Sequence, residues 1–551
     1  MEKLKPKLFS VMKTYTKEQF VKDVVAGIIV AIIALPLSIA LALASGVGPE
    51  QGIYTAIVAG FLISFFGGSR VQIAGPTAAF ATIVAGIVAQ HGMDGLVVAT
   101  VMAGIILIVM GLCHMGSLIK FIPYPITTGF TAGIAVTIVI GQLKDFMGIS
   151  YQNGEAPIET MDKLKAVCAN IGTFNWQAFL VGAVCLAVLI VWPKVSEKIP
   201  GSLIAILVGI LMVKGLGMQV NTIGDLYTIS NKLPTFALPQ FNHEIIGEML
   251  PDAFTIAILA AIESLLSCVV ADSMVNSRHR SNMELVAQGI GNIGSALFGG
   301  IPATGAIART AANVKNGGRT PIAGMVHSVT LLLVLVVFMP YAGLIPMPAI
   351  AAILFMVAYN MCQWRPFVHL VKHAPKSDIV VLVATFALTV LFDLVVAIEI
   401  GMILACLLFM KRMSDETDIH SWKYLDDDDD PDSLSLRKVS KHVRVYEISG
   451  PLFFGAADQL LDISAKDYTK VLILRMRSVP ALDATAINAL ENLYEKCVNR
   501  GITLMFSHVN EQPMHSLQKD GFVELVGEEN FCSHIDEALA RAEALYPEEN
   551  Q

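Results

Sequence analysis

The chain has 551 residues, of which 54% are hydrophobic and only 15% charged, and its formal net charge is −8. Its mean hydropathy of +0.63 exceeds what a soluble globular protein of this length needs to fill a core. The charges concentrate in residues 1–23 and in the C-terminal part, so the pattern indicates a polytopic membrane protein with a soluble tail. No basic cluster is interleaved with aromatic residues, which argues against nucleic-acid binding. Eight scattered cysteines without a CxxC pair argue against a disulfide framework or a zinc site.

A lysine-rich leader at 1–23 precedes the first apolar run, which is longer than the apolar part of a cleaved signal peptide, so we interpret that run as a spanning helix. Fourteen apolar segments are predicted in two sets of seven. The first set covers 24–44, 53–67, 71–90, 95–116, 123–148, 175–193 and 199–218. The second set covers 252–272, 283–299, 301–315, 321–341, 347–362, 377–394 and 395–411.

Charges in the predicted loops indicate the orientation in the membrane. If the leader is cytoplasmic, alternate loops should be basic. Those loops carry Arg70, Lys120, Lys194, Lys198, Arg278, Arg280, Lys315, Arg319, Arg365, Lys372 and Lys376. The opposite loops hold Glu50, Asp94 and a longer segment of mixed charge. Both termini are therefore expected in the cytoplasm, with the chain in the cell membrane. Because seven is odd, the second set must be inverted relative to the first, as in transporters built from inverted repeats.

Two stretches, at 67–79 and 299–310, interrupt the apolar pattern in the same way. Each has a Gly-Gly pair, a short extended run with a proline, and then small helix-forming residues. Broken helices at corresponding positions of two halves indicate a transporter binding site. We therefore predict half-helices in segments 3 and 10.

The two helix starts are predicted to face each other and hold an anion. Backbone N–H groups in the first turn of a helix have no intrahelical acceptor, and each N-terminus carries about half a positive charge. Two converging starts can bind an anion without a lysine. The alternative is that the small residues serve tight helix packing, but the occurrence of two such stretches favours a site. The residues concerned are Thr77, Ala78, Ala79, Gly305, Ala306 and Ile307.

Glu263 lies near the centre of an apolar segment that has no other central charge. A carboxylate at mid-membrane is costly and usually marks an ion or proton path, and Ser267, four residues on, shares its helix face. We predict that this pair serves ion coupling. The alternative is that Glu263 is a buried pairing group without a transport role.

Two further ionisable residues fall in apolar segments. Arg309 follows the second helix start by one turn, where it would either lie near a bound anion, neutralise Glu263 or extend toward the cytoplasmic side. His327 could carry a proton, but a lone histidine in such a segment is more often a packed or hydrogen-bonded group.

Residues 412–441 are predicted to be an acidic linker, and the Asp426–Asp430 run is interpreted as a solvated spacer rather than a calcium site. Beyond it, strands alternate with helices, which predicts a mainly parallel sheet covered by helices. Asp483 fits a helix N-cap, and a regulatory phosphosite at Thr485 is the alternative role for that helix start. Strands are expected at Val443–Ser449, Val471–Met476 and Ile502–Ser507, and helices at Ala456–Ala465, Ala484–Asn499, Pro513–Lys519 and Ile535–Ala544.

Taken together, these motifs resemble the SulP family of anion transporters, and the tail resembles a STAS domain. The resemblance covers nearly the whole chain. It rests on residues 34–40, 52–56, 75–77, 261–266, 299–309 and 373–376.

The resemblance implies an all-α transmembrane domain at 24–411, with fourteen segments as two inverted sevens, and a cytoplasmic α/β STAS domain at 442–551. Segments 1–4 and 8–11 would form a moving core. Segments 5–7 and 12–14 would form a gate that often dimerises. It also implies anion contacts at Thr77, Gly305, Ala306 and Ile307, a basic residue beside the site at Arg309, and cavity-lining positions at Leu37 and Leu41.

The resemblance also bears on coupling and substrate. Sodium-coupled bicarbonate members carry Asp and Thr where this chain has Glu263 and Ser267, and a hydroxyl residue in place of Ile307, so proton coupling is favoured. The sequence is most similar to the C4-dicarboxylate branch around 451–454 and 307–309. Thr485 matches a serine that is phosphorylated in antagonist proteins, without their flanking residues.

The expected function is therefore proton-coupled uptake of sulfate or a C4-dicarboxylate by an elevator-type movement. The alternatives are a sodium-coupled bicarbonate symporter, an anion channel or exchanger regulated through the STAS domain, or a membrane-anchored signalling module. Nucleobase transport is disfavoured because Ala306 and Ile307 lack polar side chains. No nucleophile–base pair is readable from spacing, so neither enzyme chemistry nor a cofactor or metal is indicated. The partners expected are a small anion, the bilayer, a second copy of the chain and a cytoplasmic protein that binds the STAS domain.

Overall fold

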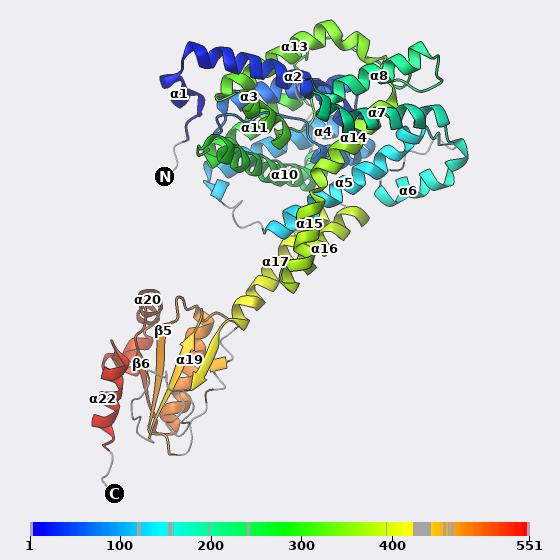
Figure 1. Ribbon diagram of the computed structural model, residues 1–551. Coiled ribbons are helices and arrows are strands. Elements are labelled where there is room, and N and C mark those ends of the chain that lie inside the picture. The colour runs from blue at the N-terminus through cyan, green and yellow to red at the C-terminus, as the bar shows by residue number, and fades with distance from the viewer. Residues whose placement is uncertain are drawn as a thin grey trace. The chain divides into compact units, whose positions relative to one another are not determined.

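The computed structural model describes residues 4–117, 123–151, 157, 159–196, 199–239, 243–392, 394–421, 442–455, 459–460, 463 and 468–547. The chain divides into two compact units, Met1–Met402 and Ile403–Gln551. The first is helical and the second is built around a sheet (Figure 1).

The first half of the helical unit contains the elements expected from the first seven apolar segments. They are α1 (Leu8–Val11), η1 (Met12–Thr14), α2 (Lys17–Ala44), α3 (Pro49–Phe66), β1 (Ala74–Gly75), η2 (Ala78–Phe80), α4 (Ala81–Leu112), α5 (Tyr124–Met147), α6 (Thr160–Ala169), η4 (Ile171–Thr173), α7 (Trp176–Val195), α8 (Gly201–Gly215) and α9 (Ile223–Leu226). The second half of predicted segment 3 and most of predicted segment 4 fall in α4, where Gly92 interrupts the helix with φ of 67°. Glycine suits this left-handed conformation because it has no Cβ.

The second half repeats this pattern. Its elements are α10 (His243–Val275), α11 (Ser281–Leu297), β2 (Thr304–Gly305), α12 (Ile307–Lys315), α13 (Pro321–Ala342), α14 (Met347–Cys362), α15 (Trp364–His373), α16 (Lys376–Leu391) and α17 (Leu394–Asp415), the last of which extends into the second unit. Helix α10 begins nine residues earlier than the apolar segment predicted at 252–272. Among the described residues, seven helices are long and apolar enough to cross a membrane by length and composition alone.

Helix packing in this unit follows the expected inverted repeat. Helix α3 packs on α13 as α11 packs on α4, α2 packs on α13 as α10 packs on α4, and α7 packs on α14 as α16 packs on α5. In each of these three comparisons, replacing every helix by its counterpart in the other half converts the first contact into the second. Helices α4 and α11 approach closely because Gly104 and Gly289 face each other's backbone, which is how small residues bring membrane helices together.

A buried carboxylate joins the two halves at the start of α2. Asp23 is fully buried, and its Oδ1 accepts from the backbone N–H groups of Arg319 (2.8 Å) and Thr320 (3.3 Å) at the start of α13. Its Oδ2 accepts from the hydroxyls of Thr320 (2.5 Å) and Tyr15 (3.0 Å). Burial and this carboxylate raise the pKa of Tyr15 to about 12. The leader thus helps to hold α2 against α13.

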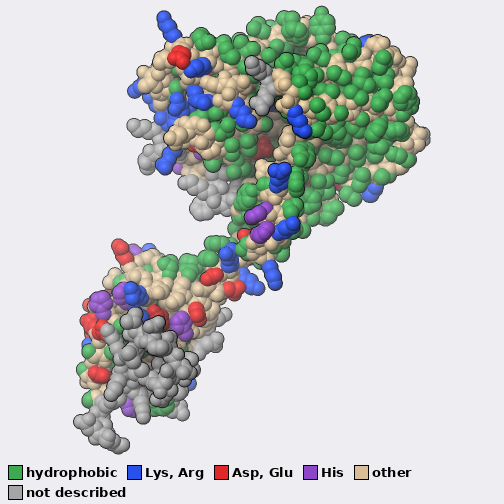
Figure 2. Space-filling view, viewed as in Figure 1, with side chains coloured by type: hydrophobic (Ala, Val, Ile, Leu, Met, Phe, Trp, Pro, Cys, Tyr) green, Lys and Arg blue, Asp and Glu red, His purple; other side chains and the backbone are tan. Residues whose placement is uncertain are grey.

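The surface of the helical unit is largely apolar on the face seen in Figure 2, and Lys and Arg side chains gather at the end that carries α1. Lys7 donates to the carbonyl of Arg278 (2.7 Å), and Arg280 donates to the carbonyl of Lys5 (2.6 Å). The leader therefore packs on the loop between α10 and α11.

The described residues of the second unit form a five-stranded sheet in the order β3-β4-β5-β6-β7. Its elements are β3 (Asp418–Ser421), β4 (Val443–Ser449), β5 (Val471–Ser478), α19 (Ala484–Asn499), β6 (Thr503–Ser507), α20 (Glu511–Asp520), α21 (Phe522–Val526), η5 (Glu528–Asn530), β7 (Phe531–Cys532) and α22 (Ile535–Leu545). Strand β3 is antiparallel to β4, and the other pairs are parallel. The buried side chains of α19 and α21 pack on one face of the sheet and those of α22 on the other.

Most of the predicted elements of this unit are confirmed, with one correction. The range 412–441 was expected to be linker throughout, but α17 continues to Asp415 and β3 occupies Asp418–Ser421. Because β3 alternates exposed and half-buried residues at the edge of the sheet, it carries little apolar signal. The aspartate run and most of the helix predicted at Ala456–Ala465 lie outside the described residues. The two-residue strand β7 was not predicted.

Candidate anion-binding site

The two interrupted stretches lie against each other in the helical unit. Strands β1 and β2 pair in antiparallel register, with Ala74 opposite Gly305 and Gly75 opposite Thr304. Helix η2, which leads into α4, begins at Ala78, and α12 begins at Ile307. The starts of the two half-helices therefore meet across this short pair of strands.

Residues in α12 and just before it form hydrogen bonds with the extended run of the first half. The backbone N–H of Ala306 donates to the carbonyl of Ile73 (2.9 Å), and the N–H of Ile73 donates to Thr310 Oγ1 (3.0 Å). Asn313 Nδ2 donates to the carbonyl of Val71 (2.9 Å). Each half thus supplies the hydrogen-bond partners that the other lacks, as buried backbone groups require.

Glu284 of α11 holds the beginning of the same run. It is fully buried, and its Oε2 accepts from the backbone N–H groups of Gly68 (2.8 Å) and Ser69 (3.1 Å). Gln288 donates to its other oxygen (2.9 Å). One oxygen therefore positions the loop, and the other is held within α11 itself.

One turn of α10 contacts both helix starts. The hydroxyl of Thr77 donates to Glu263 Oε2 over 3.0 Å. The hydroxyls of Ser264 and Thr304 are 2.6 Å apart, and the N–H of Gly305 donates to Ser264 Oγ over 3.3 Å. Consecutive residues of α10 therefore reach the first half-helix and the second.

Arg309 is buried beside the first helix start. It is 3% exposed, and its Nη2 donates to the carbonyl of Pro76, just before the first helix start, over 3.0 Å. Its side chain is therefore buried inside the helical unit and does not extend to the protein surface. Among the described residues, Arg309 forms no ion pair with Glu263, and its Nη1 is buried without a hydrogen-bond partner. The guanidinium thus retains a donor beside the paired helix starts.

The helix starts also retain backbone donors. At neither helix start does the side chain of the N-cap residue, Thr77 or Ala306, accept a hydrogen bond from the first-turn N–H groups. Ile307 is 41% exposed and Ala308 is exposed, whereas Ala78 is buried. The start of α12 is therefore exposed, and this end of the helix attracts negative charge.

Two glycines allow this close approach. A Cβ on Gly75 would collide with Arg309 Nη1, and a Cβ on Gly305 would collide with the side-chain amide of Gln72. Gln72 is itself buried, donates to the carbonyl of Ser264 (3.4 Å) and accepts from the thiol of Cys268. Any larger residue at these positions would displace buried polar side chains.

Other predicted site residues lie less directly at the helix starts. Leu37 is half-buried and Leu41 is buried on α2, which packs on α12. Ser267 is fully buried one turn beyond Glu263, and its hydroxyl has no hydrogen-bond partner among the described residues. His327 is likewise buried with both ring nitrogens unpartnered in the described part of the chain.

Sequence reasoning missed the polar residues that join the site together, namely Gln72, Ser264 and Thr304. All three are buried. The available signal was that each is a polar side chain beside a glycine-rich break or a central carboxylate in an otherwise apolar segment. Their partners could not be deduced, because the two contacts join residues 192 and 40 positions apart in the chain.

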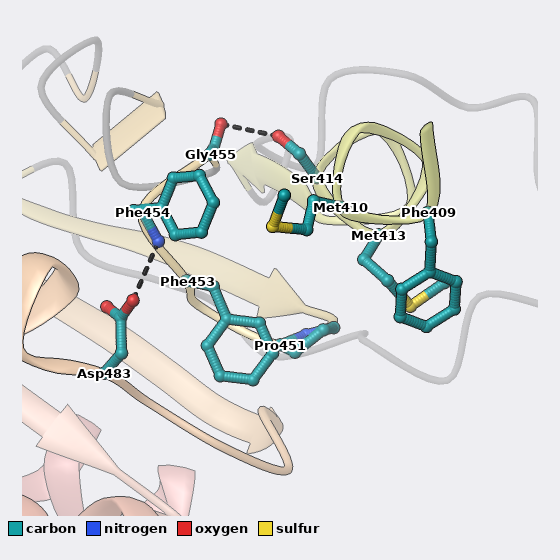
Figure 3. Close-up of a pocket in the computed structure, with 9 residues that line it drawn as sticks. All are labelled: Phe409, Met410, Met413, Ser414, Pro451, Phe453, Phe454, Gly455 and Asp483. Carbon is teal, nitrogen blue, oxygen red and sulfur yellow. Dashed lines mark hydrogen bonds between the residues drawn. The ribbon is translucent and has the colours of Figure 1, made fainter. Parts of the chain in front are cut away.

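In the second unit, Asp483 is confirmed as an N-cap: it accepts from the N–H of Ala486 (2.9 Å) and from that of Phe454 (3.0 Å). Thr485 is exposed in the first turn of α19, and its phosphorylation remains a prediction. Close by, a cavity of about 230 Å³ is lined mainly by apolar side chains (Figure 3). Its lining residues are Phe409, Met410, Met413, Ser414, Pro451, Phe453, Phe454, Gly455 and Asp483.

Comparison with known proteins places the chain in a family. Residues 20–385 match the model of the sulfate permease family, and residues 436–538 match that of the STAS domain. The chain is 41% identical over 530 residues (95% of this chain, 98% of the relative) to the "Putative sulfate transporter YvdB" of Bacillus subtilis (strain 168). It is 32% identical over 549 residues (96% and 95%) to the bicarbonate transporter BicA of Synechocystis sp..

The fold has a solved counterpart over almost its whole length. The structure of the murine Solute Carrier 26 family member A9 anion transporter in the inward-facing state covers 98% of this chain and 94% of its own, with a TM-score of 0.88 and 18% identity. It supports the architecture of a helical membrane domain followed by a STAS domain. The relatives are transporters rather than enzymes, and the chain belongs to the sulfate permease family of anion transporters.

Proposed function

We propose that this protein is a proton-coupled importer of sulfate or a C4-dicarboxylate, which binds its substrate between the starts of η2–α4 and α12. The observation that carries the proposal is the hydrogen bond from Thr77 to Glu263 at the paired helix starts. This hydrogen bond holds the Glu263 carboxylate beside the helix starts, whose backbone N–H groups would bind the anion.

The anion would be held by backbone and guanidinium donors. The first N–H groups of α12 and the unpartnered Nη1 of Arg309 supply hydrogen bonds, and the two helix dipoles supply partial positive charge. Hydrogen bonds to a charged group are stronger than neutral ones, at roughly 1.5–3 kcal/mol each. No lysine is needed for such a site.

Glu263 gives the site a reason to couple anion and proton. Two unit negative charges about 5 Å apart repel by about 3 kcal/mol at an effective dielectric constant of about 20, which lowers affinity more than a hundredfold. Among the described residues, no cation is paired with Glu263 to offset this repulsion. A proton that neutralises Glu263 removes the penalty, so the anion and the proton bind together.

The substrate class is supported by similarity and by the lining of the site. YvdB, the relative that is 41% identical, carries a name that refers to sulfate. At the second helix start, Ala306 and Ile307 provide no side-chain hydroxyl, and Ile307 is exposed. An apolar surface next to the donors would suit the carbon chain of a dicarboxylate.

We propose an elevator-type cycle in which segments 1–4 and 8–11 move past segments 5–7 and 12–14. The site is built from α4, α10 and α12, all within the first of these groups, so the anion could travel with them. We further propose that both termini are cytoplasmic, that the protein lies in the cell membrane as a homodimer, and that a cytoplasmic protein binds the STAS domain.

Sodium-coupled bicarbonate symport is the second candidate, since BicA is 32% identical over almost the whole chain. In that case Glu263 and Ser267 would ligate sodium. The buried, unpartnered hydroxyl of Ser267 is compatible with this role. An anion channel or exchanger regulated through the STAS domain is the remaining alternative.

The test uses the purified full chain in proteoliposomes. Uptake of labelled sulfate and succinate is measured with an inward proton gradient, with an inward sodium gradient and with neither. We expect uptake to saturate and to increase with the proton gradient only. Stimulation by sodium, with bicarbonate competing, would support the second candidate, and a large non-saturating anion current would support a channel.

The matched variants are Glu263→Gln and Glu248→Gln, both on α10. Glu248 is exposed and lies outside the candidate site, with its Oε2 3.7 Å from His91 Nδ1. We expect Glu263→Gln to transport the anion without responding to the proton gradient, and Glu248→Gln to behave as wild type. If Glu263→Gln kept full proton stimulation, the coupling role would be wrong.

A further inference from the structure

Helix α15 connects two segments of the membrane domain and carries an unusual surface. It follows α14 through Gln363, whose left-handed backbone (φ 45°, ψ 43°) ends one helix and starts the next. It ends before α16, which begins at Lys376. Since α14 and α16 correspond to consecutive predicted membrane segments, α15 lies where the chain turns at one membrane surface.

One side of α15 packs against the rest of the helical unit. Phe367 and Leu370 are half-buried, and the Phe367 ring lies 5.4 Å from that of Phe386 on α16. None of the residues of α15 is fully buried. The helix is therefore attached along one narrow flank, and the rest of its surface is open.

One exposed flank of α15 is apolar. Trp364, Val368 and Val371 are exposed, with Trp364 at 46%, and their spacing of i, i+4 and i+7 places them in one row. Tryptophan is enriched at the membrane–water interface because its ring is apolar and its N–H is polar. A connector between two membrane segments has lipid beside it, so this row can be covered by lipid without any protein partner.

The neighbouring flank is basic. Arg365, His369 and Lys372 repeat the same spacing, and His373 adjoins them, with its ring 4.5 Å from that of His369. Lys376 follows at the start of α16. Figure 2 shows Lys, Arg and His side chains gathered over α15 beside hydrophobic ones. Within the described residues, neither Arg365, Lys372 nor Lys376 forms an ion pair.

We propose that α15 lies in the headgroup layer and binds anionic phospholipid, with Trp364, Val368 and Val371 among the upper acyl carbons and with Arg365 and Lys372 on the lipid phosphates. An amphipathic helix with a basic polar flank and tryptophan on its apolar flank has the composition of an interfacial helix. Each basic side chain near an anionic surface strengthens the attraction to that surface about fivefold. Because the helix is anchored at both ends, it forms a fixed lipid site rather than a detachable anchor.

Tryptophan fluorescence can test both parts of this proposal in the full chain. The sequence has four tryptophans, so the substitutions Trp176→Phe, Trp192→Phe and Trp422→Phe leave Trp364 as the sole emitter. This variant is reconstituted in phosphatidylcholine vesicles that contain a minority of either brominated phosphatidylcholine or brominated phosphatidylglycerol. We expect both lipids to quench Trp364, and the anionic one to quench it more strongly at equal mole fraction.

The preference should depend on the two permanent charges. In the same background, Arg365→Gln and Lys372→Gln together should remove most of the preference, about fivefold for each charge, while quenching by phosphatidylcholine remains. The matched control is the variant that keeps only Trp176, which is 61% exposed at the start of α7. It should show no preference between the two lipids.

Two results would overturn the proposal. Trp364 that is not quenched by either lipid would place α15 in water or against protein, and equal quenching by the two lipids would remove the anionic preference. If the tryptophan substitutions prevented folding, native mass spectrometry of the wild type and of the Arg365→Gln/Lys372→Gln variant would replace them. Equal numbers of retained phosphatidylglycerol molecules would then contradict the proposal.

Discussion

The two halves of the membrane domain place the same backbone at the site but fill it with different chemistry. Strands β1 and β2 pair with each other, and each leads into a half-helix. Beside the first helix start the chain offers a hydroxyl, Thr77, and beside the second it offers apolar Ala306 and Ile307. The neighbouring first helices differ too, because α2 carries Leu37 and Leu41 whereas α10 carries Glu263 and Ser267.

The backbone scaffold of the site is therefore similar in the two halves, whereas the charged side chains are not distributed equally between them. Both ionisable groups at the helix starts, Glu263 and Arg309, come from the second half, and both contact the first: Glu263 accepts from Thr77, and Arg309 donates to Pro76. Under the proposed function, the backbone of both halves would attract the anion, and the second half alone would link it to a proton. Three perturbations test this view, from the largest expected effect to the smallest.

Removing the charge of Arg309 should have the largest effect on substrate binding. Arg309→Gln deletes a charged donor whose Nη1 has no protein partner in the described chain, so we expect KM for anion uptake to rise roughly 10- to 100-fold. The measurement is initial uptake rate against anion concentration. Arg319→Gln is the control, because that guanidinium donates to carbonyls at the other end of α12 (2.8 and 2.9 Å). An unchanged KM for Arg309→Gln would leave the site with backbone donors alone.

Adding a methyl group at the strand pair should perturb the scaffold itself. Gly75→Ala and Gly305→Ala push a Cβ into Arg309 and Gln72, respectively, and overpacking of this kind costs roughly 1–3 kcal/mol in the free energy of unfolding. Thermal unfolding in detergent, with uptake measured in parallel, would check this. Gly86→Ala on α4 is the control, since nothing lies within 4 Å of its added Cβ. If all three variants unfolded alike, close approach at the strands would not matter.

Ser267→Ala should have the smallest effect. The hydroxyl is neutral, and such a group contributes about 1 kcal/mol when it hydrogen-bonds, so we expect proton-driven uptake to fall only a few-fold. Uptake that stayed at the wild-type rate while thermal stability increased would show that Ser267 is merely a buried hydroxyl. A loss as large as that in Glu263→Gln would instead make it an equal partner in coupling.

Local patterns were sufficient to predict much of this fold. Apolar run lengths located the helices, and the two glycine-proline interruptions located the half-helices, because breaks in periodicity are local properties of the chain. Strand β3 was missed because an edge strand with little burial has a weak apolar signal. Boundaries such as the start of α10 were displaced because the apolar pattern begins later than the helix.

The connections within the site were less predictable. The sequence predicted an anion contact at Thr77 and an ion-coupling role for Glu263, but the hydrogen bond between them joins residues 186 positions apart. Arg309 was left between alternatives because its direction depends on where Pro76 lies, and that position is fixed only by the pairing of β1 with β2. Buried polar partners such as Gln72 and Ser264 are selected by tertiary contacts, which residue types alone do not reveal.

The central claim is that one anion occupies the space between both helix starts. The direct measurement is thiol modification of Thr77→Cys and, separately, Ala306→Cys, each in a chain whose eight native cysteines have been replaced, with and without substrate anion. We expect sulfate or succinate to slow modification at both positions, and Arg309→Gln to weaken the protection. Protection at neither position, or at only one of the two, would contradict it.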